Sequence, residues 1–157
     1  MLQNHILSFK LDLVMKQAAR NKVKEATILV IVYEYIVRDI LARILTAKGY
    51  RVVTCSVGFN GIRTFEKGKG KFHLVVIDMS LPGISGLGVA REIKRISQKT
   101  PVMLMKGWDE KLDEKELKDS GVDFILSKPF YMDKALDLVE NAIQVAIQPL
   151  RLKGTKE

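Results

Sequence analysis

Residues 73–94 read "HLVVIDMSLPGISGLGVAREIK", and this stretch decides the fold. A continuous apolar run ends at Asp78 and is followed by a Pro-Gly turn and then by a helical pattern. Near-continuous apolar runs are typical of strands that are buried on both faces of a parallel sheet. The stretch therefore predicts a strand over Phe72–Ile77, an acid at its carboxyl end and a helix over residues 86–97.

The same alternation of strand and helix patterns extends over the rest of the chain. Further strands are predicted at Thr27–Val32, Arg51–Cys55, Pro101–Met105 and Val122–Leu126. Further helices are predicted over residues 36–47, 59–67, 110–119 and 131–147. Five strand–helix units in this order indicate right-handed crossovers and a doubly wound parallel sheet. Such sheets place their functional sites at the carboxyl ends of the strands.

Two of the predicted helices carry a clear apolar stripe. In the helix over residues 36–47 the stripe consists of Ile36, Val37, Ile40, Leu41, Ile44 and Leu45. In the helix over residues 131–147 it consists of Ala135, Leu136, Val139, Ala142, Ile143 and Ala146. Stripes of this spacing face a hydrophobic core, so we expect both helices to pack on the sheet.

The N-terminal segment stands apart from this pattern. Within residues 1–25, one apolar seam with alternating spacings of four and three consists of Leu7, Leu11, Val14 and Ala18. This spacing predicts a helix, which would dock on the domain, pair with a second copy or be the remnant of an upstream signalling helix. We therefore divide the chain into an N-terminal helical extension (1–25), one α/β domain (26–149) and a basic tail (150–157).

Composition narrows the class of protein. The chain has 157 residues, of which 47% are hydrophobic and 28% charged, and no apolar run reaches the about 18 residues of a membrane span. The N-terminus lacks a signal-peptide pattern, so a cytoplasmic location is expected. Cys55 is the only cysteine, which excludes an internal disulfide. The net charge of +8 is concentrated at the two ends and comes without a nucleic-acid motif, so nucleic-acid binding is not expected.

The motifs after the strands resemble the receiver domain of two-component response regulators, over about residues 26–147. "ILVIVYE" (28–34) stands where that family has an apolar strand that ends in two acids. "SGVDFILSKPF" (120–130) matches its fifth strand, and "PVMLMKGW" (101–108) matches its fourth. The resemblance implies a flavodoxin-like α/β fold, in which a doubly wound five-stranded parallel sheet has the order 2-1-3-4-5, here with an extra N-terminal helix.

The resemblance also assigns roles to retained residues. Asp78 matches the aspartate that accepts a phosphoryl group, and Lys128 matches the lysine that contacts the acceptor and the phosphoryl oxygens. The bond between Lys128 and Pro129 matches one that the family often holds cis. Together these residues would supply an acceptor carboxylate and a cation for developing phosphoryl charge.

Other positions depart from the family pattern. The acid pair that helps to bind Mg²⁺ falls on Val32 and Tyr33, neither of which suits a hard cation that requires oxygen ligands. The family's switch hydroxyl falls on Lys106, its switch aromatic on Ile125 and a polar loop position on Val57. We therefore expect no metal at this position, no Mg²⁺ binding and no other cofactor.

Lys106 is the residue whose role is most open. If it lies beside Asp78, its ammonium would lower the pKa of that carboxyl and replace the missing cation. Alternatively it faces an apolar pocket and acts as an amine nucleophile, with Tyr33 as a candidate hydrogen-bonding group. The residues expected to line that pocket are Val32, Tyr33, Val57, Ser80 and Trp108.

Three functional hypotheses follow from these residues. The first is a degenerate receiver, or pseudo-receiver, that binds proteins with little or no phosphorylation. Its partner, a histidine kinase or an output domain, would bind the face formed by residues 110–119, Val122–Leu126 and 131–147. The second is an engineered receiver scaffold in which Lys106 is a Schiff-base catalyst or part of a small-ligand site, so that enzyme activity is left open. The third is a response regulator that is weakly phosphorylated at Asp78.

Overall fold

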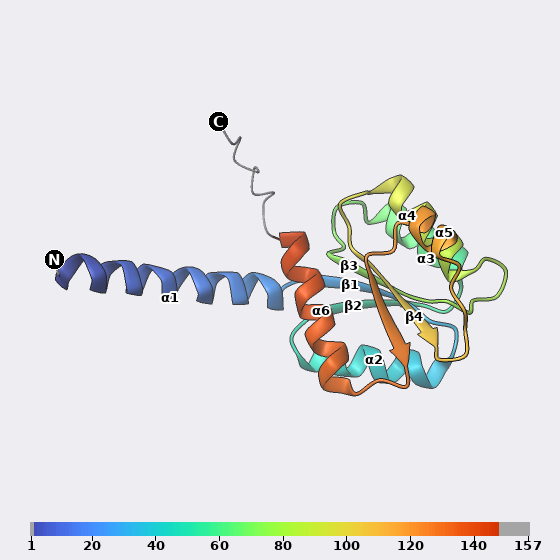
Figure 1. Ribbon diagram of the computed structural model, residues 1–157, viewed down its shortest axis with the longest axis horizontal. Coiled ribbons are helices and arrows are strands. Elements are labelled where there is room, and N and C mark those ends of the chain that lie inside the picture. Colours follow the sequence, from blue (N-terminus) through green and yellow to red (C-terminus); the bar gives the residue numbers. More distant parts are fainter. Residues whose placement is uncertain (1, 148–157) are drawn as a thin grey trace.

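The protein forms one five-stranded parallel sheet between two layers of helices (Figure 1). The structure, a computed structural model, describes residues 2–147, so the predicted basic tail over 150–157 lies outside it. The strands are β1 (Thr27–Ile31), β2 (Arg51–Cys55), β3 (Leu74–Asp78), β4 (Val102–Gly107) and β5 (Phe124–Lys128). Their order is β2-β1-β3-β4-β5 and all neighbours are parallel, which confirms the predicted fold class.

The helices divide into two layers because each buries its apolar side against one face of the sheet. Helices α2 (Tyr35–Ala47) and α6 (Met132–Ile147) cover one face (Figure 1). Helices α3 (Gly58–Lys67), α4 (Gly86–Ile96) and α5 (Glu114–Ser120) lie on the other. Every residue of β3 is buried, as a strand covered on both faces requires.

Three predicted strands end later in the structure than in the sequence interpretation. Polar residues continue the ladder beyond the apolar runs: Asp78 pairs with Met105, and Lys106 pairs with Ser127. Backbone hydrogen bonding does not depend on side-chain polarity, so an apolar run marks the buried part of a strand and not its full length. As a result, Asp78 and Lys128 are the last residues of their strands.

The stripe predicted for α2 is only partly buried. Leu41 and Leu45 are buried against the sheet, whereas Ile36 and Ile40 are exposed. The six apolar residues cover a wider arc of the helix than one sheet face can bury. The periodicity identified the helix correctly but did not indicate which edge of the stripe would face the sheet.

A long helix precedes the sheet, as predicted. Helix α1 (Leu2–Lys24) contacts α6 near the point where it enters β1, and its N-terminal part extends away from the α/β domain (Figure 1). Across residues 2–147, none of the helices combines the length with the apolarity that crossing a bilayer would demand.

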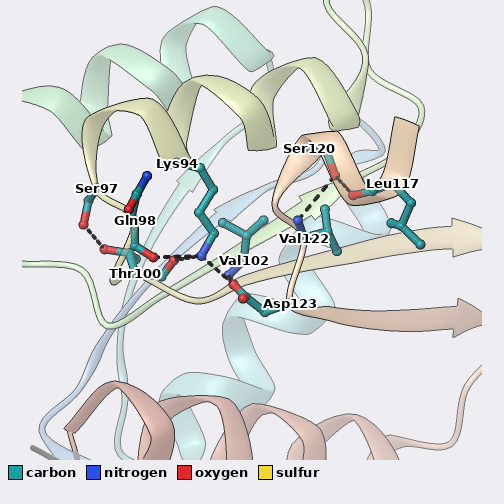
Figure 2. Close-up of polar contacts among 9 residues, drawn as sticks. All are labelled: Lys94, Ser97, Gln98, Thr100, Val102, Leu117, Ser120, Val122 and Asp123. Atoms are coloured by element: carbon teal, nitrogen blue, oxygen red, sulfur yellow. Dashed lines mark hydrogen bonds and ion pairs between the residues drawn. The ribbon is translucent and has the colours of Figure 1, made fainter. Parts of the chain in front are cut away.

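A polar network fastens the loops at the amino ends of β4 and β5, opposite the carboxyl ends of the strands (Figure 2). The Lys94 ammonium lies 2.7 Å from Asp123 and donates hydrogen bonds to the carbonyls of Gln98 and Thr100. The carboxylate of Asp123 also accepts a hydrogen bond from the backbone N–H of Val102, at 2.9 Å. The network therefore joins α4, β4 and the loop before β5.

Candidate functional site

The residues singled out by the sequence converge at the carboxyl ends of four neighbouring strands, β1, β3, β4 and β5. Asp78 ends β3, Lys106 is the penultimate residue of β4 and Lys128 ends β5. Val32 directly follows β1. Because all these strands are parallel and adjacent, their ends form one edge of the sheet.

Asp78 is a buried carboxylate that is paired with one lysine. It is 2% exposed, and each of its carboxylate oxygens lies 3.3 Å from Lys128 Nζ. The backbone N–H of Ser80 also donates to Oδ1, at 3.4 Å. Helix α4 presses on this turn, because a Cβ on Gly86 would collide with the carbonyl oxygen of Asp78.

Burial raises the pKa of the Asp78 carboxyl above its ordinary value, and the positive charge of Lys128 only partly opposes this effect. One of the two alternatives for Lys106, in which it lies beside Asp78 and lowers this pKa, differs from the contacts in the structure. Within residues 2–147 the ion pair of Asp78 is with Lys128, and removal of the carboxylate from water dominates.

Lys106 has a different role from both that were expected. Its ammonium donates to the carbonyl of Glu110 at 3.2 Å and to that of Gly107 at 3.5 Å. Trp108 is 80% exposed and Tyr33 is 57% exposed, so neither encloses the amine. The alternative of an apolar pocket closed by Trp108 and Tyr33 is not supported by these exposures; the contacts of Lys106 hold the loop between β4 and α5.

The two positions of the family's acid pair are occupied very differently. Val32 is fully buried in the hydrophobic core, and Tyr33 points outward. The backbone carbonyls of both residues accept hydrogen bonds from Arg38 Nη1, at 2.8 and 2.9 Å. A guanidinium from α2 thus holds the backbone of the β1 tip. Glu34 is exposed at the N-cap of α2 and makes no side-chain capping bond.

Glu110 is a member of the site that the sequence interpretation missed. Ser80, which was expected to line the pocket, donates its hydroxyl to Glu110 Oε1 at 2.7 Å. Glu110 Oε2 is buried and has no hydrogen-bond partner among the described residues. The charge of Glu110 also contributes to raising the pKa of Asp78. No sequence signal pointed to Glu110, because it lies in a loop with no motif around it.

The remaining predicted residues lie where the topology places them. Val57 is partly buried at the N-cap of α3. The Lys128–Pro129 peptide bond is cis, as the resemblance implied.

The oxygen donors present can be compared with what Mg²⁺ requires. Over residues 2–147 no three His, Cys, Asp or Glu side chains come together as a possible metal site. Val32 contributes no oxygen, and both oxygens of Asp78 are already within reach of Lys128. The unpartnered Oε2 of Glu110 is the one buried carboxylate oxygen here that lacks a donor among the described residues. Magnesium demands near-octahedral oxygen coordination, and the tip of β1 supplies no carboxylate for it.

A buried aspartate at the end of β3, paired with a lysine at the end of β5 in a 2-1-3-4-5 sheet, defines a receiver-type α/β protein. A family model described as the response regulator receiver domain matches residues 28–140. The chain belongs to this family.

Curated relatives support the same assignment. The uncharacterized transcriptional regulatory protein YkoG of Bacillus subtilis is 31% identical over 82% of this chain and 53% of its own length. The transcriptional regulatory protein TcrA of Mycobacterium tuberculosis is 33% identical over 74% of this chain and 45% of its own. The chain thus spans about half the length of these relatives.

Solved structures share the fold. A response regulator receiver domain protein from Clostridium thermocellum superposes with a TM-score of 0.70 at 29% identity, covering 75% of this chain and 94% of that one. The response regulator TrrA from Thermotoga maritima, in complex with Mg²⁺-BeF, superposes with a TM-score of 0.66 at 28% identity, covering 74% of this chain and 98% of that one.

Proposed function

We propose that this chain is a degenerate receiver domain, which acts by binding proteins and does not depend on magnesium-dependent phosphorylation of Asp78. The observation that carries the proposal is the tip of β1. One acid position there is a fully buried valine and the other is an outward-facing tyrosine. The domain would comprise residues 26–149, preceded by the helical extension, and would work in the cytoplasm.

The chemistry of phosphoryl transfer explains why the tip of β1 matters. The transferring group carries negative charge that the metal normally neutralises, and catalysis depends mainly on positioning and on this electrostatic stabilisation. Here Lys128 is engaged with Asp78 and Lys106 with backbone carbonyls. Neither lysine replaces the oxygen-coordinated cation, so both gain and loss of a phosphoryl group should be slow.

The proposed partner surface is the face formed by α5, β5 and α6. Ile125 on β5 and Val145 on α6 are exposed apolar residues of these elements. The curated relatives are transcriptional regulatory proteins, and this chain spans about half of their length. We therefore infer that the partner is an output domain or a histidine kinase.

One observation favours a second candidate function, a weakly phosphorylated receiver. Glu110 Oε2 is buried without a donor among the described residues, while Oε1 accepts the hydroxyl of Ser80, whose backbone N–H donates to Asp78. A carboxylate in that position could bind a cation from the loop after β4, in place of the carboxylates that the family has at the end of β1. In that case Glu110 would take part of the role of the missing acids.

Intact-mass spectrometry after incubation with acetyl phosphate and Mg²⁺ separates the two candidates. The degenerate receiver keeps its mass, whereas a weak receiver gains one phosphoryl group that is lost in Asp78→Asn. Loss of that group in Glu110→Gln as well would support the second candidate.

A binding measurement complements the mass. Trp108, the only tryptophan, lies exposed in the loop beside Lys106, so its fluorescence reports on this site. We expect no saturable change with millimolar Mg²⁺. A saturable change that Glu110→Gln abolishes and Glu34→Gln, at an exposed acid outside the site, leaves intact would refute the degenerate reading.

A further inference from the structure

Helix α1 exposes a large apolar surface that the α/β domain does not cover. Eight large apolar side chains on it are 50–81% exposed: Leu2, Ile6, Leu7, Phe9, Leu11, Leu13, Val14 and Met15. The helix contacts α6 only near its end, and its N-terminal part stands clear of the domain (Figure 1). Exposed apolar surface of this extent marks an interaction site.

The apolar residues form two seams, each with spacings of four, three and four. The first seam consists of Leu2, Ile6, Phe9 and Leu13, and the second of Leu7, Leu11, Val14 and Ala18. At about 100° per residue, the two seams lie on nearly opposite sides of the helix. Alternating spacings of three and four are those with which helices interlock side by side.

The exposed area is sufficient for self-association. The eight side chains together expose on the order of 1,000 Å², divided between the two sides of the helix, so the about 800 Å² that a standard stable interface uses from each partner is reached when neighbouring helices cover both seams. Copies of this chain carry the same seams, so the apolar residues on two packed α1 helices have the same spacing.

We propose that α1 is a self-association element, which packs against α1 of other copies of this chain. A lipid surface fits less well, because a flat bilayer covers one side of a helix and would leave the other seam in water. Neighbouring helices can cover both seams. The proposal is independent of the function proposed for the Asp78 site.

The charge on the segment gives the association a distinctive salt dependence. Residues 1–25 carry five Lys or Arg residues and two acidic residues, so copies of α1 repel one another electrostatically. Salt screens that repulsion, while apolar packing is retained. Association should therefore strengthen as the ionic strength rises, whereas binding to an acidic partner or an anionic lipid would weaken.

Sedimentation equilibrium of the full chain tests the proposal. We expect dimers or larger assemblies at concentrations on the order of 10 µM, and tighter association at about 0.5 M salt than at about 0.05 M. Phe9→Glu in the first seam and Leu11→Glu in the second should each weaken association at least tenfold. Ser8→Glu and Gln3→Glu, which add the same charge between the seams, should retain it.

Two further measurements keep the outcomes distinct. Circular dichroism and thermal unfolding should show the same α/β domain in all variants, because none of these side chains is part of its core. Co-sedimentation with vesicles of anionic phospholipid tests the competing occupant. A wild-type monomer over the whole concentration range, seam variants that associate like the controls, or a monomer that binds the vesicles would each overturn the proposal.

Discussion

Restoring one acid at a time to the tip of β1 should have very unequal effects on stability. Val32→Asp places a carboxylate at a fully buried position in the hydrophobic core, whereas Tyr33→Asp changes a side chain that is 57% exposed. Both substitutions return the residue type that the family has at these positions. Burial is therefore the main difference between the two variants.

The magnitudes follow from that burial. Val32→Asp forfeits roughly 1.5–3 kcal/mol of apolar burial and adds the cost of an ion taken from water, for a total loss of about 3–5 kcal/mol. Tyr33→Asp should change the free energy of unfolding by no more than about 0.5 kcal/mol. The free energy of unfolding is obtained from urea denaturation at pH 7.

Magnesium supplies the second part of the same test. The double variant Val32→Asp/Tyr33→Asp places two carboxylates beside Asp78, so Mg²⁺ should stabilise it, by about 2.7 kcal/mol at a hundred times the dissociation constant. The wild type should gain nothing from the same Mg²⁺ concentration. Equal costs for the two single variants, or an equal gain for the wild type, would refute the reasoning.

Three further predictions concern the stability of the α/β domain. Because burial raises the pKa of Asp78, its contribution to stability is full below the unfolded-state pKa and is lost as pH rises through the folded-state pKa. Asp78→Asn should therefore become more stable than the wild type as pH rises, in urea titrations from about pH 4 to 8. Lys94→Met should lower the free energy of unfolding by about 2–3 kcal/mol, because the Lys94 side chain is 16% exposed and contacts Asp123 and two backbone carbonyls. The matched variant Arg95→Met changes a side chain that is 67% exposed and should lower it by at most about 0.5 kcal/mol in the same assay. Gly86→Ala should lower the free energy of unfolding by about 2–3 kcal/mol, because the added Cβ would collide with the backbone of Asp78 and Met79. The Cβ of Gly88→Ala would meet the side chain of Ile84, which can move, so this variant should lose less stability; thermal unfolding compares the two.

The fold was predictable because its strands are apolar runs and its helices carry apolar stripes. Strand order, helix order and the extra N-terminal helix were all predicted correctly. The boundaries were less accurate where polar residues take over. Helix α5 begins at Glu114 and not at residue 110, because Asp113 accepts a hydrogen bond from the N–H of Lys115 as the N-cap. The residues before it form a turn in which the N–H of Glu110 donates to the carbonyl of Gly107.

The site was predictable only as far as the strand ends determine it. The strand order places Asp78 and Lys128 at one edge of the sheet, but the side-chain contacts there depend on loop conformation. The turn after β4 brings Glu110 to Ser80 and draws Lys106 onto backbone carbonyls. The helical period of α2 places Arg38 near the carbonyls of Val32 and Tyr33, yet nothing in the sequence indicates that its guanidinium turns back to them.

The pairing of Asp78 with Lys128 also changes what the two residues imply about function. Removing Lys128 alone would leave a buried carboxylate without its cation, which is strongly destabilising. Lys128 itself keeps 27% of its side chain exposed and can reach water without Asp78. The fold therefore constrains the lysine more strongly than the aspartate, whether or not a phosphoryl group is ever transferred. The presence of Asp78 and Lys128 is therefore compatible with a domain that has lost the family's metal-dependent chemistry. The residue types at positions 32 and 33, at the tip of β1, are the better indicator of that chemistry.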